Sequence, residues 1–515
     1  MKLRVGLLPA LTVLAFTAGC SVQDSKLDPS VREPAANTAS RAAGSHAHQI
    51  TANSLMRIVD SRPSHHTDIL LETLAQAEAS GVCSRDYGVA EIRIQLAQGS
   101  ADNLATADAL LMEGLLRYAN EIEGQNTRER ISLAAALEAT DFRRFIAELA
   151  PTDPEYLRLR NALEFYHVVT ASGGWVSIPS GPALKQGMVL AQIADLRRRL
   201  AITSDFRGGD LKSMRFDGEL DAAVRRFQAR HGLGIDGIVG KETRAALNVP
   251  VQERAATLAA NLCRYPLIAA KQHGTAIVVN ILGAGLKFFR DGKLMFSSAV
   301  IVGRNDWPTP IISDEVSAIE LNPYWNIPPR IVRNEMLPRI VQDPRYLEAH
   351  NIRLLSERTD PPGELDPAGI DWKSVGTGPL PFRLRQDPGP ENPMGLVKFR
   401  LNNPYHVFLH DTPTKHLFDR SKRSLSHGCV RVQDALQLAA LLLEAGAQAP
   451  ADILQKALND GAPLTIRLRE PVPVHLINIS AWVDEDGTVQ FRSDAAPGAN
   501  ENSCTATVNS ASGII

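Results

Sequence analysis

Cysteine is scarce in this chain, and long apolar runs are missing. Five cysteines in 515 residues are too few for a disulfide-built scaffold, and no Cys-x-x-Cys pair suggests a zinc or redox site. The 55 Lys and Arg nearly cancel the 57 Asp and Glu, which argues against a nucleic-acid partner. With 44% hydrophobic and 22% charged residues, the composition is that of a globular protein of two to four domains at about 100 to 200 residues each.

The N-terminus has the features of an export signal. Two basic residues precede an apolar run over 5–18, which is shorter than the roughly 20 residues of a membrane span. The run ends in Thr17-Ala18-Gly19-Cys20, which resembles the lipobox of bacterial lipoproteins except that Thr17 stands where Leu is usual. The resemblance implies lipidation of Cys20 and a periplasmic protein anchored in the outer membrane. Ordinary cleavage near Ala18 is the alternative.

Two further segments carry no evident chemistry. Residues 21–49 are rich in Ser, Ala, Asn and Pro and are expected to form a flexible tether, and its histidines lie at no metal-ligand spacing. In residues 50–175 apolar side chains recur every three or four positions, which predicts an α-helical scaffold domain. Such stripes include Leu104, Ala107, Leu111 and Leu115.

A compact segment over 183–249 predicts three short helices separated by Asp-Gly turns. The order of its residues, from Asp217-Gly218 through Phe227-Gln228 and Asp236-Gly237 to Ala246-Leu247-Asn248, resembles the peptidoglycan-binding domain of cell-wall enzymes. The resemblance implies a peptidoglycan partner. Docking of the neighbouring domain is the alternative role.

From about residue 250 to 480 the chain is expected to form one mostly β domain. The apolar period changes to two at Thr275, and Asp291-Gly292 predicts a hairpin turn. Residues 320–395 interrupt the strands with a Pro- and Trp-rich segment, which predicts an insertion that acts as a lid. Residues 494–515 are polar and predicted to be disordered.

A cysteine and a histidine in this domain form a candidate catalytic pair. The alternating residues 405–410 predict a strand that ends at His410, and 433–445 predicts a helix. Cys429 would then lie just ahead of a helix N-terminus, which lowers a thiol pKa and favours the thiolate. His410 can exchange the proton, and the Gly428-Cys429 backbone can donate to an oxyanion.

The run Ser426-His427-Gly428-Cys429-Val430-Arg431 after His410 resembles the signature of the YkuD-type L,D-transpeptidase catalytic domain. Asn322-Pro323-Tyr324-Trp325 and Leu409-His410-Asp411-Thr412-Pro413 resemble its larger YcbB-like branch. The resemblance implies an α+β multidomain enzyme: a mostly β catalytic domain with a capping insertion, a small three-helix peptidoglycan-binding domain and an α-helical scaffold domain.

The resemblance also implies residue roles and a reaction. Cys429 would be the nucleophile and His410 the general acid and base, with His427 and Gly428 at the oxyanion hole. Substrate contacts are expected from Arg431, Ser426, Tyr324 and Trp325, although Arg431 could instead hold the loop, Ser426 could be structural and the aromatic side chains could pack inside the cap. The enzyme would need no cofactor or metal. It would join a tetrapeptide stem, with loss of D-alanine, to the diaminopimelate side-chain amine of another stem.

Two alternatives use the same sequence features. A hydrolase could employ the same Cys and His on wall peptides, and a non-catalytic lipoprotein could merely tether the wall. Among Cys83, Cys263 and Cys504, one disulfide is possible in an oxidising compartment, and the sequence does not choose the pair.

Overall fold

The computed structural model describes residues 65–79, 87–123, 142–149, 153–270, 274–343, 345–356, 363–375, 379–446 and 452–492. The predicted signal, Cys20, the tether, Cys83, Cys504 and the predicted tail lie outside these residues. Within them, no helix is both long and apolar enough to cross a bilayer.

Helices occupy the first half of the described chain. The first group shares one core around Leu74, Ile92, Leu111 and Phe142. It contains α2 (His65–Ala79), α3 (Val89–Gln98), α4 (Ala101–Glu123) and α7 (Phe142–Leu149).

A second core joins segments that are distant in sequence. Helix α8 (Pro154–Ala171) packs on α12 (Val251–Ala270), and both contact the hairpin of β13 (Ala481–Val483) and β14 (Val489–Phe491). Tyr166 meets Phe491 edge to face in this core. Helix α8 therefore shares its core with residues that come before the barrel strands in the sequence and with residues that come after them.

The segment between these helices folds as three short helices around Leu196, Leu220 and Phe227. Asp217 caps the N-terminus of α10, since its carboxylate accepts a hydrogen bond from the Leu220 N–H at 3.0 Å. Such an N-cap satisfies a backbone donor that the first helical turn leaves free. The helices are α9 (Gln192–Ile202), α10 (Gly218–Arg230) and α11 (Lys241–Leu247).

A nine-stranded sheet forms the centre of the β domain, in the order β10-β3-β11-β9-β8-β4-β12-β1-β2. Because β3 also pairs with β2, the sheet closes into a barrel. Its strands are β1 (Ala276–Asn280), β2 (Gly285–Arg290), β3 (Lys293–Gly303), β4 (Ile312–Leu321), β8 (Val397–Arg400), β9 (Leu409–His410), β10 (Ser424–Ser426), β11 (Val430–Val432) and β12 (Leu464–Ile477).

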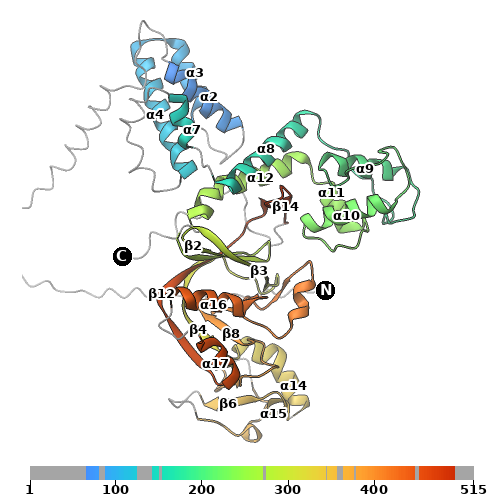
Figure 1. Ribbon diagram of the computed structural model, residues 1–515, viewed down its shortest axis with the longest axis vertical. Helices are drawn as coiled ribbons and strands as arrows, with labels where there is room; N and C mark the ends of the chain where they lie inside the picture. The colour runs from blue at the N-terminus through green and yellow to red at the C-terminus, as the bar shows by residue number, and fades with distance from the viewer. Residues whose placement is uncertain are drawn as a thin grey trace, which may run out of the picture. The chain divides into compact units, whose positions relative to one another are not determined.

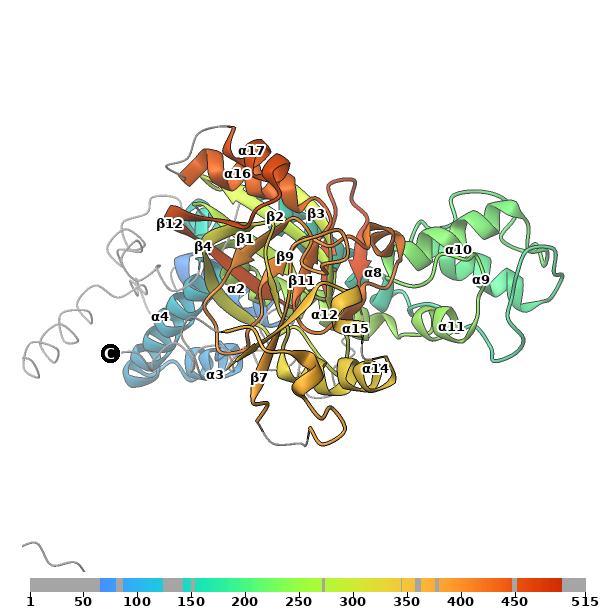
Figure 2. The same ribbon diagram turned by 90° about the horizontal axis from the view of Figure 1, so that it is seen from below.

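Apolar side chains of every second residue fill the barrel core. Ile319, Phe399, Leu409 and Val430 are fully buried there, together with the apolar face of α16 (Ala435–Gly446). Helix α17 (Ile453–Asp460) lies near α16 in both ribbon views (Figure 1, Figure 2). The short η4 (Lys415–Asp419) lies between β9 and β10 in the chain.

The insertion that interrupts the strands of the barrel folds around a core of its own, which contains Ile331, Met336, Leu354 and Phe382. A three-stranded sheet in the order β5-β7-β6 supports it. The elements are β5 (Trp325–Asn326), α13 (Pro329–Ile331), the π-helical η2 (Val332–Met336), α14 (Leu337–Gln342), α15 (Tyr346–Ala349), β6 (Ile352–Ser356), η3 (Pro367–Gly369) and β7 (Phe382–Gln386). The insertion thus lies between β4 and β8 in the chain.

The predicted strand over 405–410 was too long. Only Leu409–His410 is β-strand, and His406 has a φ of 53°, in the left-handed region that no strand residue adopts. The side-chain amide of Asn403 bonds both the N–H and the carbonyl of Val407, which makes a turn of this segment. His406 and His410 therefore do not share the face of one strand.

Candidate active site

Strand register brings the predicted catalytic residues together. Parallel strands β9 and β11 pair His410 with Arg431, and Val430 with Leu409. Cys429, one residue before Val430, therefore lies beside Phe408, since the Val430 N–H also donates to the Phe408 carbonyl at 3.0 Å. Alternation along each strand then puts Cys429, Arg431 and His410 on the face opposite the buried Leu409 and Val430.

The nucleophile candidate is reachable. Cys429 is the free cysteine of the described residues and is half-buried. Its Sγ lies 3.8 Å from the carbonyl oxygen of His406, to which a thiol can donate. The left-handed backbone of His406 thus directs a carbonyl at the sulfur.

The expected helix-lowered thiol pKa is wrong. Cys429 precedes strand β11 instead of a helix, and the next helix, α16, begins only at Ala435. The sulfur therefore does not lie at the first turn of a helix, where the helix dipole would lower its pKa. Burial raises the pKa of the Cys429 thiol, while a hydrogen bond from Phe408 and the positive charges of Lys398 and Arg431 act in the opposite direction. The resting sulfur is therefore a protonated thiol.

His410 is held as a neutral base. It is 2% exposed, and burial, assisted by the positive charge of Arg431, lowers its pKa to about 3. Its Nδ1 lies 2.5 Å from the carbonyl of Asp411, and since a carbonyl only accepts, Nδ1 carries the hydrogen. That tautomer leaves Nε2 able to accept a proton.

The backbone around Gly428 is tightly specified. Gly428 has a φ of 107°, which favours glycine. Its carbonyl accepts a hydrogen bond from the Thr309 hydroxyl at 2.7 Å, and its N–H donates to Ser426 Oγ at 3.1 Å. The Ser426 hydroxyl donates in turn to the Cys429 carbonyl at 2.5 Å. Ser426 therefore braces the loop, and the Gly428 N–H that was expected at the oxyanion hole is already bonded.

His427 is held from two sides. Its Nε2 lies 2.5 Å from Oε1 of Glu335, and its ring meets Trp307 edge to face at 4.7 Å between centroids. Glu335 belongs to the insertion, whereas Trp307 follows β3.

A charged row crosses the sheet beside the cysteine. Register pairs Glu320 with Lys398, Lys398 with His410, and His410 with Arg431. The Lys398 Nζ lies 3.0 Å from Glu320 Oε2, while the buried Nε of Arg431 has no hydrogen-bond partner. The row presents positive charge on both sides of His410.

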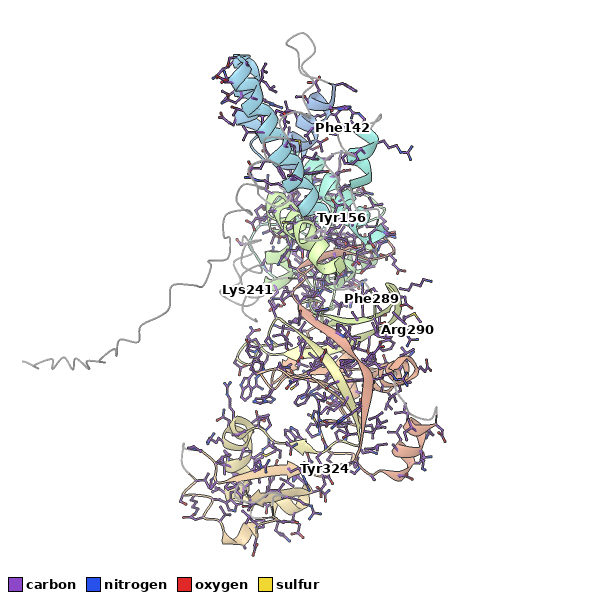
Figure 3. All side chains as sticks on the ribbon, turned by 90° about the vertical axis from the view of Figure 1, so that its left-hand side faces the viewer. Phe142, Tyr156, Lys241, Phe289, Arg290 and Tyr324 are labelled. Atoms are coloured by element: carbon purple, nitrogen blue, oxygen red, sulfur yellow. The ribbon has the colours of Figure 1, made fainter. Side chains whose placement is uncertain are left out.

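The aromatic residues predicted for substrate contact lie in different surroundings. Trp325 is partly buried against the core of the insertion. Tyr324 is 36% exposed, where the chain leaves the barrel (Figure 3), and Arg385 stacks over its ring at 4.0 Å. Sequence reasoning missed Glu335, Trp307, Thr309 and Lys398, which lie far from the motif in sequence and carried no signal of their own.

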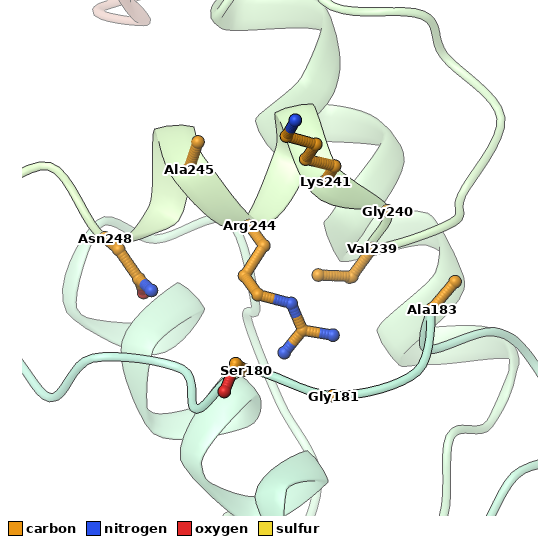
Figure 4. A pocket seen from close by; sticks show the side chains of 9 residues that line it. All are labelled: Ser180, Gly181, Ala183, Val239, Gly240, Lys241, Arg244, Ala245 and Asn248. Carbon is orange, nitrogen blue, oxygen red and sulfur yellow. The ribbon is translucent and has the colours of Figure 1, made fainter.

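A cavity of about 380 Å³ lies in the three-helix segment, away from this chemistry, lined by residues that include Lys241, Arg244 and Asn248. Figure 4 shows the Arg244 guanidinium directed at Ser180 and Gly181, while the Lys241 ammonium points elsewhere. Arg244 donates to the carbonyls of Pro179 and Pro182, so it ties down the preceding loop.

The barrel thus carries a cysteine, a histidine and an arginine on one face. Residues 274–466 match the L,D-transpeptidase catalytic domain of the YkuD family, and residues 191–247 match the family described as "Putative peptidoglycan binding domain". The chain therefore carries an L,D-transpeptidase catalytic domain and a peptidoglycan-binding domain.

A curated relative from Haemophilus influenzae (strain ATCC 51907 / DSM 11121 / KW20 / Rd), described as "Putative L,D-transpeptidase", is 37% identical over 237 residues. The match covers 45% of this chain and 46% of the relative, so less than half of either protein is compared.

Solved structures with local similarity include an L,D-transpeptidase from Mycobacterium smegmatis, at 12% identity and a TM-score of 0.20, covering 39% of this chain and 58% of that one. Another is L,D-transpeptidase 3 from Mycobacterium tuberculosis in complex with a faropenem-derived adduct, at 14% identity and a TM-score of 0.19, covering 39% and 60%.

Proposed function

We propose that this protein is a peptidoglycan L,D-transpeptidase that uses Cys429 as its nucleophile. The observation that supports this most directly is the register of β9 and β11, which places Cys429, His410 and Arg431 on one face of the barrel. Peptidoglycan as substrate is supported by the two matched domains.

Acylation begins from the neutral pair. His410 Nε2 takes the thiol proton as Sγ attacks the carbonyl at the L-centre of diaminopimelate, and the same proton then goes to the departing amine of D-alanine. A thioester to Cys429 remains. Because both groups start uncharged, proton transfer accompanies attack, and the positive charges of Lys398 and Arg431 stabilise the developing anions.

Deacylation reverses the proton's path. The side-chain amine of a second stem attacks the thioester carbonyl, gives its proton to His410, and His410 returns it to the departing sulfur. The product links two diaminopimelate residues. Attack by water in place of the amine would make the enzyme a hydrolase, which is why exclusion of solvent matters at this stage.

We assign Arg431 to recognition of a substrate carboxylate. Its buried Nε lacks a partner, and a buried guanidinium donor is costly to leave unpaired. A carboxylate of the donor stem satisfies such a donor with the geometry that arginine prefers. We also propose an exported, periplasmic protein that Cys20 anchors to the outer membrane; a mature protein recovered without a lipid mass increment would contradict the anchor.

The reaction is tested by incubating the purified protein with a disaccharide-tetrapeptide and analysing the products by mass spectrometry. A cross-linked dimer is expected. Tripeptide alone would identify a hydrolase, and unchanged substrate would leave only the wall-tethering alternative.

Cys429→Ala tests the nucleophile, because removal of the sulfur abolishes thioester formation. The covalent mass adduct with a carbapenem is expected on the wild type and not on the variant, whose thermal unfolding should stay close to that of the wild type. An adduct that persists in C429A would exclude Cys429 as the acylated residue.

A further inference from the structure

Two side chains connect the insertion to the loop that carries the nucleophile. Glu335 contacts the ring of His427, two residues before Cys429, through Oε1 and Nε2 at 2.5 Å. A carboxylate accepts and does not donate in its ionised form, so the hydrogen of this contact belongs to Nε2. The contact therefore fixes the orientation of the His427 ring from outside the barrel.

Trp307 makes the second connection. It packs against the core of the insertion, and the guanidinium of Arg330, which belongs to α13, stacks over its ring at 3.7 Å. The Trp307 ring also meets the ring of His427 edge to face. A Cβ at Gly428 would lie 3.8 Å from the Trp307 carbonyl and 3.5 Å from that of Pro308, so this segment also lines the backbone beside the sulfur. His427 is thus held between Glu335 of the insertion and Trp307, which the insertion itself clamps.

The local backbone of Glu335 is unusual. Val332–Met336 is a π-helical turn between α13 and α14, a rare conformation that occurs mainly as a single turn and frequently at functional sites. Val332 and Met336, at its two ends, are buried in the core of the insertion. Glu335 belongs to this turn, is only half-buried, and bonds His427 in the loop that carries Cys429.

Building on the proposed function, we propose that Glu335 is a positioning residue. It couples the insertion, when the insertion is in contact with the barrel, to the loop over 426–429 that carries Cys429, and it does so through His427. With the insertion in place, the Glu335 carboxylate and Trp307 hold His427, and His427 holds the Gly428-Cys429 backbone in the geometry for attack. When the insertion is displaced, that support is lost. Acylation is then restricted to the covered site, in which the thioester is protected from water.

Glu335→Ala tests the coupling, with Glu348→Ala as the matched control because Glu348 is an exposed carboxylate of the same insertion, on α15. We expect E335A to slow acylation by a carbapenem on the order of 10-fold to 100-fold, as a small misplacement of reacting groups does. We also expect more tripeptide relative to cross-linked dimer. Glu335→Gln should recover part of the rate, because its amide oxygen still accepts from Nε2. E348A should behave like the wild type.

A double-mutant cycle with His427→Ala separates positioning from general loss of stability. If Glu335 acts through His427, adding E335A to H427A changes the acylation rate little further. Additive losses, or wild-type rates and product ratios in E335A, would overturn the coupling while leaving the transpeptidase proposal intact. A wild type that forms neither adduct nor dimer would instead contradict the proposed function itself.

Discussion

The properties of single residues at the site depend on burial more than on sequence neighbours. His410 and Cys429 are both shifted by desolvation toward their uncharged forms, so the site rests as thiol and imidazole. In the proposed reaction, charge develops only as the bond to substrate forms, and Lys398 and Arg431 lie close enough to Cys429 to stabilise it.

Replacing Arg431 by Ala tests carboxylate recognition. We expect the KM for a tetrapeptide stem to rise about tenfold or more, as loss of a hydrogen bond to a charged group predicts, with a smaller change in kcat. Arg431→Lys should restore only part of the affinity, because a lysine cannot bond a carboxylate in bidentate fashion.

Arg467→Ala is the control for this prediction, since Arg467 is an exposed arginine of β12. A change in kcat with KM unchanged would assign Arg431 to support of the loop instead.

At the residue scale the sequence motif predicted the candidate catalytic residues, and the structure showed which other side chains contact or neighbour them. His410, Cys429 and Arg431 could be selected from the sequence because their spacing is specific. Glu335, Trp307 and Lys398 could not, since a single acidic, aromatic or basic residue has no distinguishing sequence pattern. Only the pairing of β8 with β9, and the fold of the insertion, bring them to the site.

Among the elements, the insertion has the clearest mechanistic consequence. It has its own core and sheet, and it contacts the nucleophile loop through Glu335 and Trp307. A thioester is hydrolysed unless water is kept away while the amine arrives.

Deleting the insertion, by joining β4 to β8 with a short glycine-containing loop, is expected to shift the products from dimer toward hydrolysed tripeptide or to abolish turnover. Mass spectrometry of the products measures the ratio. Circular dichroism checks that the barrel still folds, and cross-linking at the wild-type level by the folded variant would contradict a role for the insertion.

Element prediction was wrong near the nucleophile for a local reason. The apolar alternation over 405–410 is compatible with a strand, but Asn403 closes a turn there through side-chain hydrogen bonds. The helix was predicted to start near Gln433, close enough to act on Cys429, but β11 separates the two. Short strands of two or three residues hold too few side chains to show a period.

For the whole molecule, two buried neutral histidines link stability to pH. Burial lowers the pKa of His410 to about 3 and that of His231 well below its ordinary value of 6.5. Between pH 6.5 and pH 4 the unfolded chain binds protons at both sites, whereas the folded protein does not. Folding stability therefore falls as pH decreases through this range, by at most about 1.4 kcal/mol per pH unit for each histidine.

Thermal unfolding measured between pH 7 and pH 4 checks this. We expect His410→Asn and His231→Asn each to make the decrease less steep. His65→Asn, at an exposed position, should leave the slope unchanged. An unaltered slope in both buried variants would mean that other groups dominate the acid response.

The second cysteine of the described chain belongs to this scale too. Cys263 on α12 is disulfide-bonded, and the sequence allowed at most one such bridge among Cys83, Cys263 and Cys504. Its candidate partners Cys83 and Cys504 lie outside the described residues, so the pairing stays open. The boundaries of the predicted domains also stay predictions, although α8, α12 and the β13-β14 hairpin share one core.

The sequence by itself determined which chemistry to propose, because a cysteine, a histidine and a glycine at fixed spacing indicate which atoms can attack, accept a proton and allow a tight backbone. It also determined the order of helical and β segments, since hydrophobic period is a local property. Tertiary structure alone decided the protonation of the pair, the partners of His427 and the charged row beside His410. Those depend on desolvation and on strand register, which are set by residues tens of positions apart in the chain.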